Sequence, residues 1–152
     1  MSTLALAIAT SFGVGYAPFA PGTFGSAAGL LLWAILPASA VAQVAAVTAV
    51  LAVGIWSAEL TERRVGATDP GIVVVDEVLG MVVTLALVPV GWGGAIVGFV
   101  LFRAFDVIKP YPANRFERLH GGLGIMLDDA MAGVYSNLAL RLVLAAAPAG
   151  LL

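Results

Sequence analysis

The first 58 residues of the chain contain no Asp, Glu, Lys or Arg, and this feature most restricts how the chain can fold. All charged residues lie between Glu59 and Arg141, most of them in three clusters at 59–77, 103–120 and 128–129. A soluble domain scatters its charges, whereas a membrane protein gathers them at the ends of its spans and at functional sites. The chain is 61% hydrophobic and 11% charged, and an ordinary soluble domain is about 25% charged. We therefore expect lipid to be its solvent.

Gly and Pro residues divide the chain into apolar segments that predict an all-α fold. A helix needs about 20 mostly apolar residues to cross a bilayer, and the segment 40–60 meets this length easily. The segment 26–37 is short and could instead dip into the bilayer and return. We expect a single domain over residues 1–152, a polytopic transmembrane helical bundle of about four to six helices, with segments at 26–37, 40–60, 72–90, 93–106 and 125–147.

Tracing these segments back and forth across a bilayer places all three charge clusters on one side. Six of the seven basic residues then lie on that side, so the positive-inside rule predicts that it faces the cytoplasm. Arg141 is too far along the last segment for that face and could reach the opposite interface. A net charge of −2 without a basic tract makes nucleic acid an unexpected partner, and the absence of cysteine excludes thiol chemistry.

Two adjacent acidic pairs, Asp76–Glu77 and Asp128–Asp129, lie near the starts of two apolar segments. One acid at a helix N-terminus is explained by the helix dipole, worth about 0.3–1 kcal/mol. Two acids at each helix need a further explanation, because an ionised acid at the centre of a membrane helix costs about 2.5–3.5 kcal/mol. Neighbouring carboxylates also repel each other unless a cation lies among them. Because Mg²⁺ binds carboxylate and phosphate oxygens, the pairs favour a metal site over capping.

Two glycines share helical faces with these acids. Gly80 follows Asp76 by four residues, and Gly133 follows Asp129 by four. Small residues let membrane helices pack closely. We therefore expect the two helices to bring both acidic pairs into one site.

Arg103, Asp106 and Lys109 are spaced by three residues and share a face if they are helical. A ladder of ion pairs at a membrane interface explains this spacing, and such surface pairs are weak. Beside the acidic pairs, the interpretation as a phosphate site gains weight, since Arg binds phosphate in bidentate fashion and Lys binds it as a point charge.

The segment 21–26 is rich in glycine and precedes an apolar run. Its backbone N–H groups could bind an anion together with Thr23 and Ser26. The same two side chains could also cap a helix that binds nothing. No Gly-Lys-Ser/Thr follows, so the segment is not a P-loop.

Residues 114–120 are predicted to form a short interfacial helix with Phe116 and Leu119 facing lipid. His120 is the single histidine of the chain. A histidine next to two glycines is more often a local hydrogen-bonding group than a nucleophile, so it receives no catalytic role.

Four segments in order resemble the phosphatidylglycerophosphatase A family. They are Gly-Thr-Phe-Gly-Ser at 22–26, Asp-Glu-Val-Leu-Gly at 76–80, Phe-Arg-Ala-Phe-Asp-Val-Ile-Lys-Pro at 102–110 and Gly-Gly-Leu-Gly-Ile-Met-Leu-Asp-Asp-Ala-Met-Ala-Gly at 121–133. The resemblance runs from about residue 13 to 140, and the last segment is its most specific part.

The resemblance implies an enzyme of the bacterial inner membrane, which the topology above predicts to be multi-pass with its active site facing the cytoplasm. Such an enzyme uses Mg²⁺ to hydrolyse phosphatidylglycerophosphate to phosphatidylglycerol and inorganic phosphate. It also implies an all-helical fold with a central acid-bearing helix surrounded by others. The positions that match the family pattern are Thr23, Ser26, Asp69, Asp76, Glu77, Arg103, Asp106, Lys109, Asp128 and Asp129.

From the residues and the resemblance together we assign roles as hypotheses. Arg103 and Lys109 bind the phosphate with Thr23 and Ser26, and Lys109 also stabilises the transition state. Asp106 is a candidate base or a further ligand. Attack by water is favoured over an aspartyl-phosphate, whose Asp-x-Asp signature is absent. The expected Mg²⁺ ligands are Asp76, Glu77, Asp128 and Asp129, and the expected catalytic residues are Asp76, Asp106, Asp129 and Lys109.

Two other functions remain open at this point. A CDP-alcohol-type phosphotransferase also uses intramembrane acids and Mg²⁺, but its Asp-Gly and Asp-Gly-x-x-Ala-Arg pattern is absent from the chain. A non-enzymatic ion or proton carrier also uses intramembrane carboxylates. In a carrier, however, Arg103 and Lys109 would repel the cation.

Overall fold

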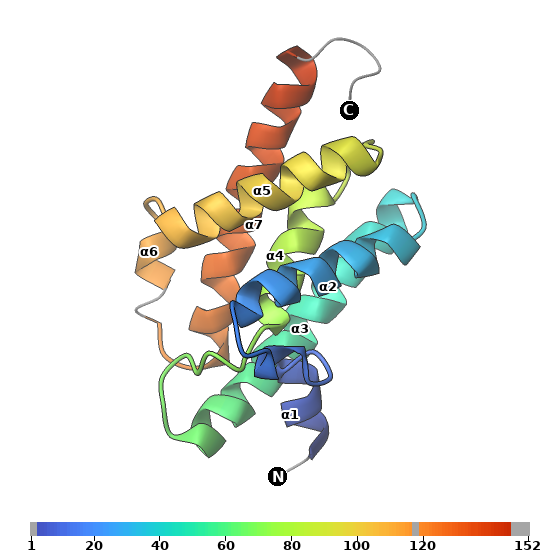
Figure 1. The fold of residues 1–152 in the computed structure, drawn as a ribbon. Coiled ribbons are helices and arrows are strands. Elements are labelled where there is room, and N and C mark those ends of the chain that lie inside the picture. Colours follow the sequence, from blue (N-terminus) through green and yellow to red (C-terminus); the bar gives the residue numbers. More distant parts are fainter. Residues whose placement is uncertain (1–2, 117–118, 147–152) are drawn as a thin grey trace.

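The computed structural model describes residues 3–116 and 119–146, and in these ranges it contains helices and no strands (Figure 1). The prediction of an all-α fold is confirmed. In chain order the elements are α1 (Thr3–Ala9), the 3-10 helix η1 (Val14–Tyr16), α2 (Pro21–Ile35), α3 (Ala40–Val65), α4 (Val75–Leu85), α5 (Trp92–Ile108), α6 (Ala113–Phe116) and α7 (Gly122–Ala146).

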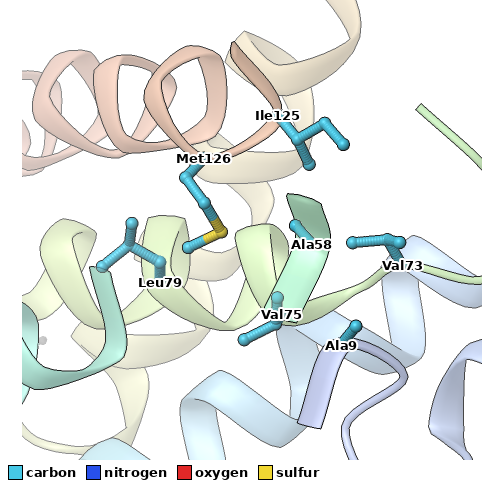
Figure 2. Close-up of a cluster of buried hydrophobic side chains, with 7 residues drawn as sticks. All are labelled: Ala9, Ala58, Val73, Val75, Leu79, Ile125 and Met126. Atoms are coloured by element: carbon cyan, nitrogen blue, oxygen red, sulfur yellow. The ribbon is translucent and has the colours of Figure 1, made fainter. Parts of the chain in front are cut away.

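The helix α4 lies at the centre of the bundle, in contact with α2, α3, α5 and α7. Nine of its 11 residues are buried, among them Asp76 in its first turn. This confirms the predicted central helix that carries acids. One apolar cluster packs around the first half of α4 and joins it to α1, α3 and α7 (Figure 2); it consists of Ala9, Ala58, Val73, Val75, Leu79, Ile125 and Met126.

The central helix is shorter than the apolar segment 72–90 suggests. It begins after Val74, whose φ of −140° and ψ of 7° are not helical, and ends before Leu87, which has a left-handed φ of +58°. Eleven residues at about 1.5 Å each give roughly 16 Å, about half of the hydrocarbon thickness of a bilayer. Length and hydropathy counted along the sequence therefore overestimated this helix, because a backbone turn interrupts the apolar run.

Among the described residues, one helix, α3, is long and apolar enough to cross a membrane by length and composition, and α2 is a shorter apolar helix. Only 17% of the most apolar window of α3 is buried. In a soluble protein such a helix would lie in the core, so this exposed apolar surface fits contact with lipid. The full number of membrane crossings stays a prediction.

Helices α4 and α7 are parallel and pack very closely. A Cβ on Gly133 would lie 2.5 Å from the carbonyl oxygen of Gly80, and a Cβ on Gly80 would lie 2.8 Å from the carbonyl oxygen of Asp129. Only glycine fits at both positions. The expected close approach at Gly80 and Gly133 is confirmed.

The prediction of a helix over 114–120 is met only at its beginning, where α6 covers Ala113–Phe116. Residues 117 and 118 lie outside the described residues. His120 follows in an irregular, exposed position.

Candidate functional site

Three carboxylates from two helices meet at one end of the bundle. Asp76 and Glu77 occupy the first turn of α4, and Asp129 lies in the second turn of α7. One oxygen from each of them can be chosen so that all three lie within 4.8 Å of one another. The prediction that residues of both acidic pairs converge is therefore met by three of the four acids.

Asp76 and Asp129 are buried, Glu77 is half-buried, and each of the three has an oxygen without a partner among the described residues. Asp76 is 8% exposed and Asp129 is 3% exposed. The atoms Asp76 Oδ1, Glu77 Oε2 and Asp129 Oδ2 are buried and have no hydrogen-bond partner within residues 3–116 and 119–146. A buried charge without a partner is strongly unfavourable, and three together repel one another. A hard divalent cation such as Mg²⁺ fits this all-oxygen donor set.

Asp128, the predicted fourth ligand, has different partners. Its Oδ2 accepts a hydrogen bond of 2.6 Å from Lys109 Nζ, and its Oδ1 accepts one of 2.9 Å from the backbone N–H of Asp129. The side chain is only 5% exposed, so this is a largely desolvated ion pair. Asp128 thus fixes Lys109 near the three carboxylates.

Arg103 and Asp106 also lie beside this group. Arg103 Nη1 is 2.7 Å from Asp106 Oδ2 and donates a hydrogen bond of 3.3 Å to Ser26 Oγ. Asp106 is close enough to Asp129 for their carboxyl groups to share a hydrogen bond, and it also acts electrostatically on Glu77. The predicted face of Arg103 and Asp106 is therefore directed toward the acids.

The first turn of α2 forms a further wall of the site. A Cβ on Gly22 would lie 2.2 Å from Glu77 Oε1 and 3.2 Å from Arg103 Nη1, so the backbone of this turn contacts both side chains. Ser26 Oγ donates to the carbonyl oxygen of Gly22 at 2.9 Å. Thr23 lies in the same turn and is partly buried.

Asp69 lies in the loop between α3 and α4, at a left-handed φ of +46°. It acts electrostatically on Asp76 and Asp128 and lines a small cavity together with Asp128 and Glu62. The loop therefore adds negative charge beside the site.

Glu59, which has no role predicted from the sequence, holds the start of α7. Its Oε2 accepts a hydrogen bond of 2.7 Å from the N–H of Gly122, and its Oε1 lies 2.6 Å from Arg63. A Cβ on Gly122 would lie 2.0 Å from the carbonyl oxygen of Ile55, so α7 meets α3 at a glycine. The only signal in the sequence is that Glu59 is the first charge after the apolar segment.

The family model described as phosphatidylglycerophosphatase A matches residues 7–144. No solved structure gave a significant match.

Three curated proteins are similar over most of their length. A protein of Bacteroides thetaiotaomicron, provisionally named a phosphatidylinositol-3-phosphatase, is 41% identical over 89% of this chain and 90% of its own. Phosphatidylglycerophosphatase A of Escherichia coli is 40% identical over 85% of this chain and 77% of its own. Phosphatidylglycerophosphatase A of Haemophilus influenzae is 37% identical over 85% and 82%. The chain therefore belongs to the phosphatidylglycerophosphatase A family.

Proposed function

We propose that this protein is a lipid phosphatase that hydrolyses phosphatidylglycerophosphate to phosphatidylglycerol and inorganic phosphate. The observation that carries the proposal is the group of three carboxylates, the buried Asp76 and Asp129 and the half-buried Glu77, next to the cations Arg103 and Lys109. Carboxylates that hold a metal and cations that bind phosphate are the two parts that phosphate-ester hydrolysis needs. Family membership supports the same reaction.

The same proposal places the chain in the bacterial inner membrane as a multi-pass protein. Exposed large apolar side chains occur on most of the helices, including Leu31 on α2, Val41 on α3 and Val100 on α5. The charged side chains of the site gather at one end of the bundle, at the starts of α4 and α7 and the end of α5. With the positive-inside rule, this end faces the cytoplasm. The lipid substrate would reach it sideways, with its tails remaining among the apolar helices.

Magnesium is the proposed cofactor, and Asp76, Glu77 and Asp129 would hold it. When bound, Mg²⁺ would neutralise charge on the phosphate and polarise the P–O bond. Asp128 would support the site through Lys109 and through its contact with the backbone of Asp129.

The remaining residues have roles that follow from their positions. Arg103 would bind two phosphate oxygens, and Lys109 would place a point charge on a third. Ser26, already bonded to Arg103, would orient the guanidinium group, and Thr23 offers a hydroxyl in the same turn.

Asp106 would act as the general base. A water oxygen attacks phosphorus, its proton passes to the Asp106 carboxylate, and the ester P–O bond to glycerol breaks. The glycerol oxygen leaves with a proton returned from the same carboxyl group, which gives phosphatidylglycerol and inorganic phosphate.

Phosphate release by purified protein in detergent micelles tests this function. With phosphatidylglycerophosphate and Mg²⁺ we expect turnover that Asp76→Asn and Asp129→Asn lower by at least about 100-fold, since both remove a proposed metal ligand. Arg64→Gln is the matched control, because Arg64 is exposed on the same side and outside the site. Full activity of both Asn variants would contradict the assignment of these residues as metal ligands. Absence of phosphate release from the wild-type protein would contradict the proposed enzymatic activity.

The substrate is tested in the same assay. The relatives are named for two different lipid phosphate monoesters, so phosphatidylinositol 3-phosphate serves as the competing substrate. A higher kcat/KM for phosphatidylglycerophosphate is expected. A higher kcat/KM for phosphatidylinositol 3-phosphate would agree with a lipid phosphatase and would contradict the proposed substrate.

A further inference from the structure

The polar side chain Asn137 binds the C-terminal end of the central helix. Its Nδ2 group donates to the carbonyl oxygens of Val83, Thr84 and Ala86, at 3.1, 3.0 and 2.9 Å. The last carbonyls of a helix have no partner within the helix. In lipid, where water is not available, such groups must be satisfied by protein. One side chain of α7 thus provides the C-terminal cap of α4.

Asn137 is itself held in place. Its Oδ1 accepts a hydrogen bond of 2.8 Å from Arg141 Nε, and Arg141 Nη2 donates to the carbonyl oxygen of Leu87 at 2.8 Å. The N–H of Leu87 in turn donates to Gln43 Oε1 of α3 at 2.7 Å. These bonds also explain the position of Arg141, which the predicted topology places on the side opposite to the other charged residues. Together the three side chains form a polar lock at the end of α4.

The polar lock and the carboxylate site are the same distance apart on both helices. Asn137 follows Asp129 by eight residues on α7, and Thr84 follows Asp76 by eight residues on α4. The two helices run in the same direction (Figure 1). Eight residues correspond to about 12 Å of helix. If α4 slid along α7 at the lock, Asp76 would therefore move relative to Asp129 by the same amount.

Between these two ends, the helices are held by apolar contacts. The contact of Gly80 with Gly133 lets the backbones approach, and the side chain of Val83 packs against Gly133. Such contacts are not directional, whereas the hydrogen bonds of Asn137 satisfy three carbonyls in only one register. The lock thus adds a directional constraint on the register.

We propose that Asn137 is a positioning residue: it sets the register of α4 on α7 and so the spacing of Asp76 and Glu77 from Asp129. This inference rests on the proposed function, because those three carboxylates are the proposed metal ligands. Metal sites need ligand distances within about 0.2 Å, whereas a slip of one residue moves a helix by about 1.5 Å. Loss of the lock therefore weakens metal affinity.

Binding of Mn²⁺, which accepts the same oxygen ligands, tests the inference without relying on catalysis. Electron paramagnetic resonance of free Mn²⁺ gives the dissociation constant and the number of sites for purified protein in detergent. For Asn137→Leu, which removes the amide donor, we expect a dissociation constant raised by about tenfold or more with an unchanged number of sites per folded protein.

Ser136→Ala is the matched control. Ser136 is the adjacent buried polar residue, and its Oγ donates at 2.7 Å to the carbonyl oxygen of Ala132 in its own helix. It does not take part in the lock, so its variant should bind Mn²⁺ as the wild type does. A purely structural role of Asn137 would lower the number of sites and leave the dissociation constant unchanged, which would overturn the inference.

Arg141→Met decides the question if Asn137→Leu does not fold. Arg141 is exposed, and its loss removes two bonds of the lock, the one to Asn137 Oδ1 that orients the amide and the one to the carbonyl oxygen of Leu87. A dissociation constant raised in the same direction, by a smaller factor, supports the inference, and an unchanged one overturns it. Wild-type protein that binds no Mn²⁺ would overturn the metal site and this inference with it, whereas wild-type affinity in Asn137→Leu would overturn this inference alone.

Discussion

Lys109 Nζ lies 2.6 Å from Asp128 Oδ2, and this ion pair joins the end of α5 to the second turn of α7. The two side chains are 21% and 5% exposed, so both charges are largely removed from solvent. The pair therefore separates the roles of two adjacent acids, since Asp128 binds Lys109 while Asp129 joins Asp76 and Glu77.

Removing one partner of this ion pair is expected to lower the free energy of unfolding more than removing both partners. Lys109→Met leaves the Asp128 charge buried and uncompensated, which lowers the free energy of unfolding by about 3 kcal/mol. The double variant Lys109→Met with Asp128→Asn should recover part of this loss. Urea unfolding in a fixed detergent measures the cycle, and strictly additive effects would contradict a coupled pair.

Metal binding is expected to stabilise the folded protein. A ligand that binds only the folded state adds about 2.7 kcal/mol at 100 times its dissociation constant. Mg²⁺ should therefore raise the midpoint of thermal unfolding of the wild-type protein, and EDTA should reverse the rise. The same titration on Asp129→Asn should give little change, and an equal rise there would show that the cation binds elsewhere.

Gly133→Ala is expected to destabilise the bundle and to lower activity. The added Cβ would lie 2.5 Å from the carbonyl oxygen of Gly80, a backbone atom that cannot turn away. Overpacking of this kind costs about 1–3 kcal/mol, and it pushes α7 away from α4 beside the site. The control is Gly71→Ala, where the new Cβ meets no atom of the described part of the chain within 4 Å. Thermal unfolding and phosphate release measure both variants, and equal behaviour of the two would contradict the close contact.

Glu59→Ala is expected to loosen the start of α7. The substitution removes the acceptor for the N–H of Gly122, a change worth about 1 kcal/mol. Glu59→Gln retains an acceptor oxygen at the same reach and should lose less. Hydrogen exchange of the Gly122 amide follows the bond directly. Exchange as slow in Glu59→Ala as in the wild type would exclude this role.

Much of the site could be predicted from the sequence, because the evidence there is local. An acid within an apolar helix is unfavourable wherever that helix packs, so the four acids Asp76, Glu77, Asp128 and Asp129 stand out without any knowledge of the fold. The same holds for Gly80 and Gly133, whose spacing from the acids follows from helical periodicity alone.

The partners of these residues could not be predicted in the same way. Asp128 and Asp129 are chemically alike and adjacent, and only the rotation of α7 directs one to Lys109 and the other to α4. The end of α4 before Leu87 depends likewise on a backbone turn that hydropathy does not detect.

By itself the sequence determined that the chain is helical, that its first 58 residues carry no charge and which acids are unusual. The tertiary structure decided which acids share a site and where the central helix stops. Hydropathy and helical spacing are properties of one segment, whereas the bonds of Asn137 to α4 join residues more than 50 positions apart. Such contacts exist only once the helices have packed in a single register.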